Sequence, residues 1–132
     1  LPPGTGDIQL TLVQKIALTG AVIITTPQDL SLIDASKAAE MFKKVNTPIL
    51  GIVENMSYFV MPGTNEKIQI FPGNAGTRES KRLKVPLLGE IMISPDLSLA
   101  SDSGMPYVLK YNNSDLSNTF ESIANNIIIN IT

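Results

Sequence analysis

The sequence predicts an α/β domain whose sheet is doubly wound and mainly parallel. Three short apolar runs, at 20–27, 48–53 and 86–91, contain β-branched residues and are bounded by Gly or Pro, which favours strands buried on both faces. Segments with helical spacing of apolar residues separate these runs. Apolar strands that alternate with helices are typical of right-handed β-α-β units. The sequence contains no internal repeat or linker, so we expect one domain.

Helical periodicity defines the segments between the strands. The expected helices cover residues 8–18, 29–45, 77–84, 95–104 and 114–130. In the first helix Ile8, Leu12 and Ile16 lie on one stripe, and Asp7 is a plausible N-cap. The fourth helix is expected to end at Gly104 as a C-cap.

Two of the helices carry longer apolar stripes. In the second helix the expected stripe is Leu30, Ile33, Ala38, Met41, Phe42 and Val45, with Lys37, Lys43 and Lys44 facing outward. In the last helix it is Leu116, Phe120, Ile123 and Ile127. Both patterns predict helices that cover a sheet. Residues 57–76 are polar and rich in Gly and Pro, and we expect a small hairpin there around KIQIF.

Composition excludes several classes of function. The 132 residues are 43% hydrophobic and 17% charged, with a net charge of −2 and no Cys or His. Disulfides, a zinc site of the usual ligands, a Cys nucleophile and a His base are therefore excluded. Nucleic-acid binding is not expected, because no cluster of Lys and Arg is present. No apolar run approaches the ~20 residues of a membrane span, and the lack of Cys is compatible with the cytoplasm.

The opening stretch LPPGTGD, residues 1–7, is a turn that leads into a helix. Its prolines cannot continue a strand ladder, and Gly4 allows a close approach of backbone to a ligand. Placed after a strand, such a turn suits a phosphate and its metal; it is equally compatible with an ordinary β-α turn and a capped helix.

The strand that should come before this turn is not in the chain. We therefore expect residues 1–132 to be the C-terminal part of a larger α/β domain. Parallel strands need neighbours to satisfy their backbone groups. On its own the piece should therefore expose a sheet edge and aggregate or remain molten.

Five stretches, taken together, resemble the Mrp family of iron–sulfur carrier ATPases, in the deviant P-loop group that includes MinD and ParA. They are LPPGTGDIQLTL (1–12), TTPQDLSLIDASKAAEMF (25–42), GIVENMSYFVMP (51–62), VPLLGEI (85–91) and SDSGMPYV (101–108). The resemblance implies the C-terminal part of a doubly wound P-loop NTPase domain. Its Gly-rich phosphate loop and acidic Walker B-type residue would lie upstream of Leu1.

The resemblance also implies a nucleotide site for ATP and Mg²⁺. LPPGTGD would be the switch II segment, with the Gly4 N–H near the γ-phosphate. Asn55 would contact the adenine ring, because an amide offers both a donor and an acceptor; without the resemblance it is simply a turn residue after a strand. No residue of this chain is expected to be catalytic.

Asp34 and Lys37 lie three residues apart on one helix. One interpretation is an intrahelical ion pair worth about 0.2–0.5 kcal/mol. The other follows from the resemblance, since such ATPases form ATP-sandwich homodimers in which acids of this helix can meet the loop Lys of the partner.

The sequence departs from the family pattern at the metal-binding motif. The family has Cys-Pro-x-Cys after Ser-Tyr-Phe, whereas here Met61 and Thr64 stand at the Cys positions. A thioether and a hydroxyl do not replace two thiolates, so we expect no metal ligand in this chain. Met92 stands where the family commonly has a Pro that helps shape the adenine pocket.

Three functions remain open at this stage. The first is an ATP-binding and hydrolysing iron–sulfur cluster carrier or assembly factor, cytoplasmic and serving apo iron–sulfur client proteins. The second is an ATP-gated positioning switch like MinD or ParA, which is disfavoured because residues 114–130 contain no Lys or Arg for an anionic membrane. The third is a non-catalytic fragment or interaction module.

Overall fold

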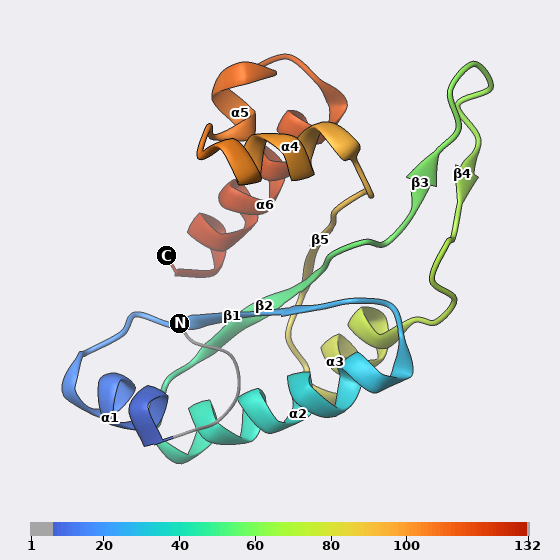
Figure 1. Ribbon diagram of the computed structural model, residues 1–132. Helices are drawn as coiled ribbons and strands as arrows, with labels where there is room; N and C mark the ends of the chain where they lie inside the picture. The colour runs from blue at the N-terminus through green and yellow to red at the C-terminus, as the bar shows by residue number, and fades with distance from the viewer. Residues whose placement is uncertain (1–6, 132) are drawn as a thin grey trace.

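A computed structural model describes residues 7–131 and arranges them in three layers (Figure 1). The middle layer is a parallel sheet in the order β1 (Ala21–Thr25), β2 (Ile49–Glu54) and β5 (Leu87–Glu90). Helices α2 and α3 cover one face, and α6 packs on the other. The predicted α/β architecture with a parallel sheet is confirmed.

The helices match the predicted segments. They are α1 (Asp7–Lys15), α2 (Asp29–Lys44), α3 (Ala75–Leu83), α4 (Pro95–Ser103), α5 (Tyr107–Lys110) and α6 (Asp115–Ile131). Only α5 was not predicted, because four residues are too few to show a helical period. Gly104 ends α4 with a φ of 72°, as the C-cap prediction requires. Asp7 lies inside the first turn of α1 rather than before it, where its charge still favours the helix N-terminus.

The predicted hairpin in the insert is also present. Strands β3 (Phe59–Val60) and β4 (Lys67–Ile68) pair antiparallel, and the hairpin projects away from the body of the domain (Figure 1). The chain leaves the sheet after β2 to form it and returns at α3.

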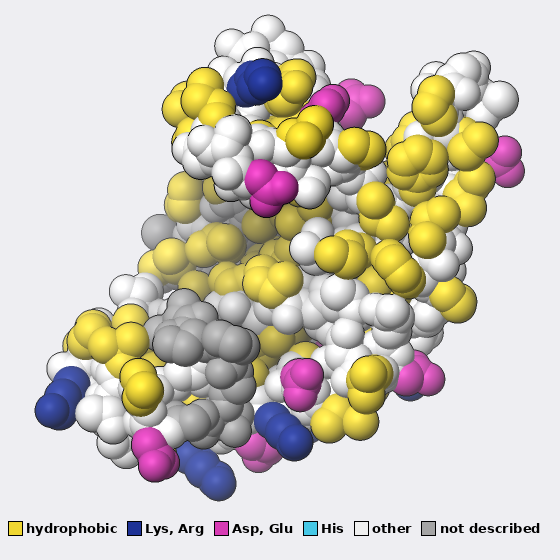
Figure 2. Space-filling model, in the orientation of Figure 1, with side chains coloured by type: hydrophobic (Ala, Val, Ile, Leu, Met, Phe, Trp, Pro, Cys, Tyr) yellow, Lys and Arg dark blue, Asp and Glu magenta, His cyan; other side chains and the backbone are white. Residues whose placement is uncertain are grey.

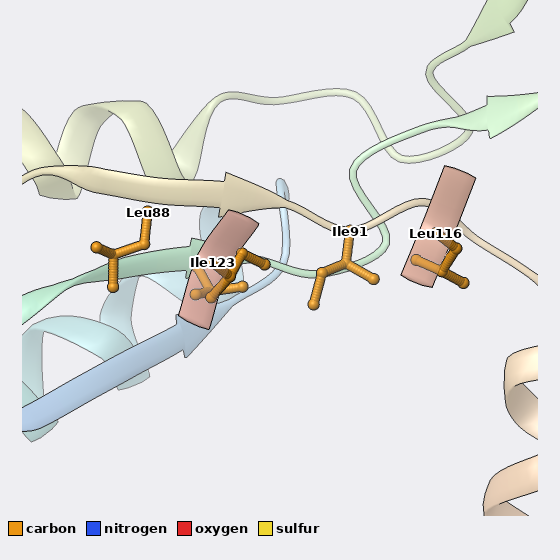
Figure 3. Close-up of a cluster of buried hydrophobic side chains, with 5 residues drawn as sticks. Leu88, Ile91, Leu116 and Ile123 are labelled. Carbon is orange, nitrogen blue, oxygen red and sulfur yellow. The ribbon is translucent and has the colours of Figure 1, made fainter. Parts of the chain in front are cut away.

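The α6 face of the sheet holds the largest core cluster. Its buried members are Val53, Leu88, Ile91, Leu116 and Ile123. Figure 3 shows Leu116 and Ile123 projecting from α6 toward Leu88 and Ile91. Phe120 and Ile127 pack against the cluster from the same helix. The predicted stripe of the last helix is thus confirmed.

On the opposite face, small residues of α2 pack against the sheet. Ala35 and Ala39 of α2 lie against Ile23 and Ile52, and Ile52 is fully buried. A polar contact ties α2 to α3 above this cluster. There the fully buried Glu79 accepts hydrogen bonds from Ser36 Oγ (2.6 Å) and Arg82 Nε (2.5 Å).

The structure corrects the predicted face of the first helix. Ile8, Leu12 and Ile16 are exposed, by 77%, 38% and 48%. The helix instead buries Val13 against Met41 and Phe42 of α2. This contact turns the predicted stripe toward solvent, since residues one position apart on a helix point about 100° apart.

The predicted stripe of α2 is correct only at its C-terminal half. Met41 and Phe42 are buried, whereas Leu30 and Ile33 are 77% and 54% exposed. Helix α1 covers this side of α2 only near Met41. Lys37, Lys43 and Lys44 face solvent as predicted.

Strand β1 is buried on one face rather than on both. Ile23 is buried, but Ile24 is 58% exposed. The reason is that α6 lies mainly over β5 and β2; Val22 of β1 packs against its core cluster, whereas Ile24 is left uncovered. Within residues 7–131, no strand pairs with the outer edge of β1. The outer side of β5 is partly closed, because Asn126 Nδ2 of α6 donates to the Leu88 carbonyl (2.9 Å).

Replacing Ile24 with Lys is expected to raise the monomeric fraction of the 132-residue chain. A charge beside an open strand edge discourages association through that edge. Sedimentation velocity measures the effect, and Leu99→Lys, which removes an exposed Leu from α4, is the matched control. A wild-type chain that is monomeric and unfolds in one sharp cooperative transition contradicts this expectation.

Candidate functional site

The polar residues of the candidate site lie where the three parallel strands end. The register pairs Thr25 of β1 with Glu54 of β2, and Glu54 with Glu90 of β5. Their carboxyl ends therefore lie side by side. In open α/β sheets, ligands bind outside this edge of the sheet.

Asn55 follows β2 directly and is held at this edge. Its backbone N–H donates to the Thr25 carbonyl (2.7 Å), which extends the β1–β2 ladder by one residue. Its side-chain Oδ1 accepts a hydrogen bond from the Met56 N–H (2.9 Å). The side chain is half-buried. No hydrogen bond of the amide Nδ2 is found within residues 7–131.

The next residues form a tight turn. Met56 has a φ of 55°, in the left-handed region that a non-Gly residue rarely adopts. The chain is then fixed to the end of β5, because Ser57 N donates to the Ile91 carbonyl (2.9 Å) and Ile91 N donates to the Glu54 carbonyl (2.8 Å).

A buried carboxylate lies under this turn. Glu54 is 5% exposed. Its Oε1 accepts a hydrogen bond from Ser57 Oγ (2.7 Å), and its Oε2 accepts one from the Gly76 N–H at the start of α3 (2.9 Å). Ser57 Oγ also lies 2.9 Å from Glu90 Oε2. Glu54 and Ser57 were not among the predicted site residues, since neither residue type at the end of a strand indicates burial by itself.

A cavity of about 470 Å³ opens beside Asn55. Residues from both faces of β1 line it, together with Asp34 of α2 and Gln9 of α1, so it runs along the outer edge of the strand. Gln9 is 4% exposed, and its Oε1 has no hydrogen-bond partner in the described chain. A buried acceptor without a donor lowers the stability of the fold, so this oxygen calls for a donor from outside the described residues.

Asp34 and Lys37 are not paired with each other in the structure. Asp34 lines the cavity with Asn55, whereas Lys37 lines a different hollow between α1 and α2. Among residues 7–131 the ion pairs of α2 are Lys43–Glu40, Arg82–Glu40 and Arg78–Asp29. The intrahelical Asp34–Lys37 pair does not form. Both side chains are exposed on the helix face that also carries Leu30 and Ile33.

The remaining residues singled out in the sequence are not at this edge or are not described. Gly4 falls outside the described residues. Met61 and Thr64 are in the turn of the β3–β4 hairpin, which is closed by a hydrogen bond from Asn65 N to the Met61 carbonyl (3.1 Å). Met92 is half-buried against the core cluster of α6.

The hairpin has an apolar surface in place of metal ligands. Met61 is 38% exposed and Ile70 is 49% exposed, and Figure 2 shows hydrophobic side chains gathered along this hairpin. No group of three or more His, Cys, Asp or Glu within 7–131 could hold a metal ion. None of the helices described there is long and apolar enough to cross a membrane.

Curated relatives resemble the chain over almost its whole length. It is 48% identical over 124 residues to an iron-sulfur cluster carrier protein of Deinococcus radiodurans, covering 94% of this chain and 35% of the relative. It is 42% identical over 128 residues to the iron-sulfur cluster transfer protein NUBPL of Mus musculus, covering 97% and 40%. The chain therefore spans well under half the length of these relatives.

Solved structures show the same fold. A nucleotide-binding protein from Archaeoglobus fulgidus in complex with ADP superposes with a TM-score of 0.69 at 41% identity, over 79% of this chain and 43% of that one. The cell division ATPase MinD of Pyrococcus furiosus superposes with a TM-score of 0.62 at 27% identity, over 83% and 42%. The described sheet and helices are thus part of a P-loop ATPase fold.

The family model for the ParA-type NUBPL iron-transfer P-loop NTPases matches residues 1–128. This match covers the parallel sheet, the Asn55 turn and the hairpin together. The chain belongs to the NUBPL iron-transfer P-loop NTPase family.

Proposed function

We propose that this chain is the C-terminal part of an ATP-binding and hydrolysing carrier that takes part in iron–sulfur protein assembly. The observation that supports this most directly is Asn55, held by its Oδ1 and backbone at the carboxyl edge of a parallel sheet and beside a 470 Å³ cavity. In this proposal Asn55 recognises adenine, and Gly4 lies near the γ-phosphate.

Catalysis would depend on residues from the remaining part of the P-loop domain. Phosphoryl transfer to water in such NTPases rests on the positioning of the phosphates and Mg²⁺ by a Lys-containing loop. The present sequence contains no Gly-rich loop with such a Lys. The role of this chain is therefore to bind and orient the nucleotide base.

We place the rest of the domain along the outer edge of β1, with the nucleotide base at the end of the cavity beside Asn55. This edge has no strand partner within 7–131, and the cavity along it contains the unpartnered Oε1 of Gln9. A neighbouring segment that brings an N–H donor to Gln9 would remove both deficits, since buried polar groups are normally hydrogen-bonded.

The residues of this chain do not fit an iron–sulfur cluster, because the sequence contains no Cys. In the proposed carrier the cluster is cargo for apo iron–sulfur client proteins. Its thiolate ligands would come from another region or another protein. The proposal retains a cytoplasmic location, which fractionation of cells expressing a tagged protein tests.

We further propose that the carrier acts as a homodimer that uses the exposed face of α2. Leu30, Ile33, Asp34 and Lys37 are at positions i, i+3, i+4 and i+7 and therefore share one helix face. Two exposed apolar side chains lie beside an acid and a base that form no ion pair within residues 7–131, and such a surface suits a protein interface better than solvent.

Nucleotide binding is expected only when the rest of the domain is present. The extended form is defined as residues 1–132 together with the coding sequence that precedes Leu1 in frame. Mg-ATP at 100 times its Kd should stabilise the extended form by about 2.7 kcal/mol, and calorimetry should detect no binding to residues 1–132 alone. A reading frame that begins at Leu1, or an extended form that binds no Mg-ATP, contradicts the proposal.

The wild-type extended form is expected to gain no stoichiometric iron–sulfur absorbance through Met61 and Thr64. Met61→Cys combined with Thr64→Cys should restore such absorbance after anaerobic reconstitution, because two chains would then supply a four-Cys ligand set. The two single variants are the matched controls. Equal absorbance in the wild type and the double variant would show that ligands elsewhere hold the cluster.

Replacing Ile33 with Lys should weaken the dimer of the extended form by about tenfold in Kd or more. The exposed apolar side chain would be lost and a charge placed at the interface. Analytical ultracentrifugation with ATP and Mg²⁺ measures this, with Leu99→Lys as a change on another exposed surface. An unchanged dimer constant for Ile33→Lys rules out this face of α2.

A further inference from the structure

We infer that Glu54 is a positioning residue that sets the base specificity of the nucleotide site by fixing the side-chain amide of Asn55. This inference rests on the proposed function, in which Asn55 meets the base. It adds a role for a buried carboxylate that does not itself reach the nucleotide.

The first step is the separation of Glu54 from the cavity. Asn55 lines the 470 Å³ cavity along β1, whereas Glu54 and Ser57 line another of about 420 Å³ beneath the hairpin. Successive residues of an extended chain point to opposite sides. Glu54 therefore cannot contact a base held by Asn55 and must act through the backbone.

The second step is the network that Glu54 organises. Its two oxygens accept hydrogen bonds from Ser57 Oγ and the Gly76 N–H, which tie the turn to the start of α3. The approach at Gly76 is close, since a Cβ built there would lie 2.7 Å from Glu54 Oε2. Only Gly fits at position 76 while this carboxylate keeps its place.

A residue with an unfavourable backbone conformation lies inside this network. Met56, with its φ of 55°, lies between Glu54 and Ser57, so the Glu54–Ser57 hydrogen bond closes directly around it. Such a conformation is unfavourable for a non-Gly residue and persists only where the surrounding structure holds it. The contacts of Glu54 and Ser57 on either side of Met56 hold it in this conformation.

The fourth step links this backbone to base recognition. The Met56 N–H donates to Asn55 Oδ1, and this bond prevents the amide from turning over. A fixed amide presents its acceptor to the adenine N6 amino group and its donor to N7. Guanine has the O6 acceptor in place of N6, so Oδ1 would face another acceptor. A loose amide could turn and offer Nδ2 instead, which would accommodate guanine.

The experiment compares ATP and GTP affinities of the extended form by calorimetry. Glu54→Ala should lower the preference for ATP over GTP by about tenfold, nearly as much as Asn55→Ala, through weaker ATP binding. Ser57→Ala should lower it in the same direction, and it provides a second test should Glu54→Ala fail to fold. Glu54→Gln should keep most of the preference, because its carbonyl can accept from Gly76 while its amide donates to Ser57 Oγ, which then donates to Glu90.

Glu79→Ala is the matched control. Glu79 is also a buried carboxylate that accepts from a Ser hydroxyl, but it lies between α2 and α3, outside the cavity lined by Asn55. This variant should lose stability and keep the wild-type ATP preference.

The possible results distinguish a missing positioning role of Glu54 from a missing adenine contact at Asn55. If Asn55→Ala loses the ATP preference while Glu54→Ala and Ser57→Ala keep it, Glu54 has no positioning role and the nucleotide site stands. If Asn55→Ala also keeps the preference, the adenine contact and this inference both fail. If Glu79→Ala changes the preference as much as Glu54→Ala, the effect is general destabilisation and the inference fails.

Discussion

The parallel register of the three strands is the constraint on which the rest of this structure depends. Because Thr25, Glu54 and Glu90 are neighbours in the ladder, every strand ends at the same edge. The loops that follow must start there together. The Asn55 turn is consequently joined by backbone hydrogen bonds to β1 on one side and to the end of β5 on the other. A ligand-binding residue placed in this turn inherits the rigidity of the whole sheet.

This constraint also explains how far the sequence could predict the fold. Apolar runs bounded by Gly and Pro located all three strands, since a strand buried between helices requires such a run. Helical periodicity located every long helix. The pattern could not decide which stripe of a helix faces inward where two stripes are apolar. In α1 the contact of Val13 with Met41 and Phe42 decided it, and that contact is a tertiary property invisible to local spacing.

The candidate site was likewise predictable only where local sequence pattern, and not tertiary contact, decides the structure. The position of Asn55 after an apolar strand was predictable from the sequence, whereas its adenine contact came only from the family resemblance and stays a prediction. The helix that carries Asp34 was predicted, but whether Asp34 pairs with Lys37 depends on side-chain directions in the folded state. Glu54 was missed because a carboxylate at the end of a strand has the same local pattern whether it is solvated or buried. Only the approach of Gly76 from α3, 22 positions along the chain, makes it an interior group.

The projecting hairpin has a consequence for the history of such proteins. Its strands are two residues each, and its turn contributes nothing to the three core clusters. Substitutions at the tip should therefore have little effect on the stability of the core. Side chains at the hairpin tip, such as a thiol or a thioether, can therefore be exchanged without changes to the packed domain beneath the hairpin. In the proposed carrier, a change in the chemistry of the hairpin tip would therefore leave the nucleotide site at the sheet edge unaltered.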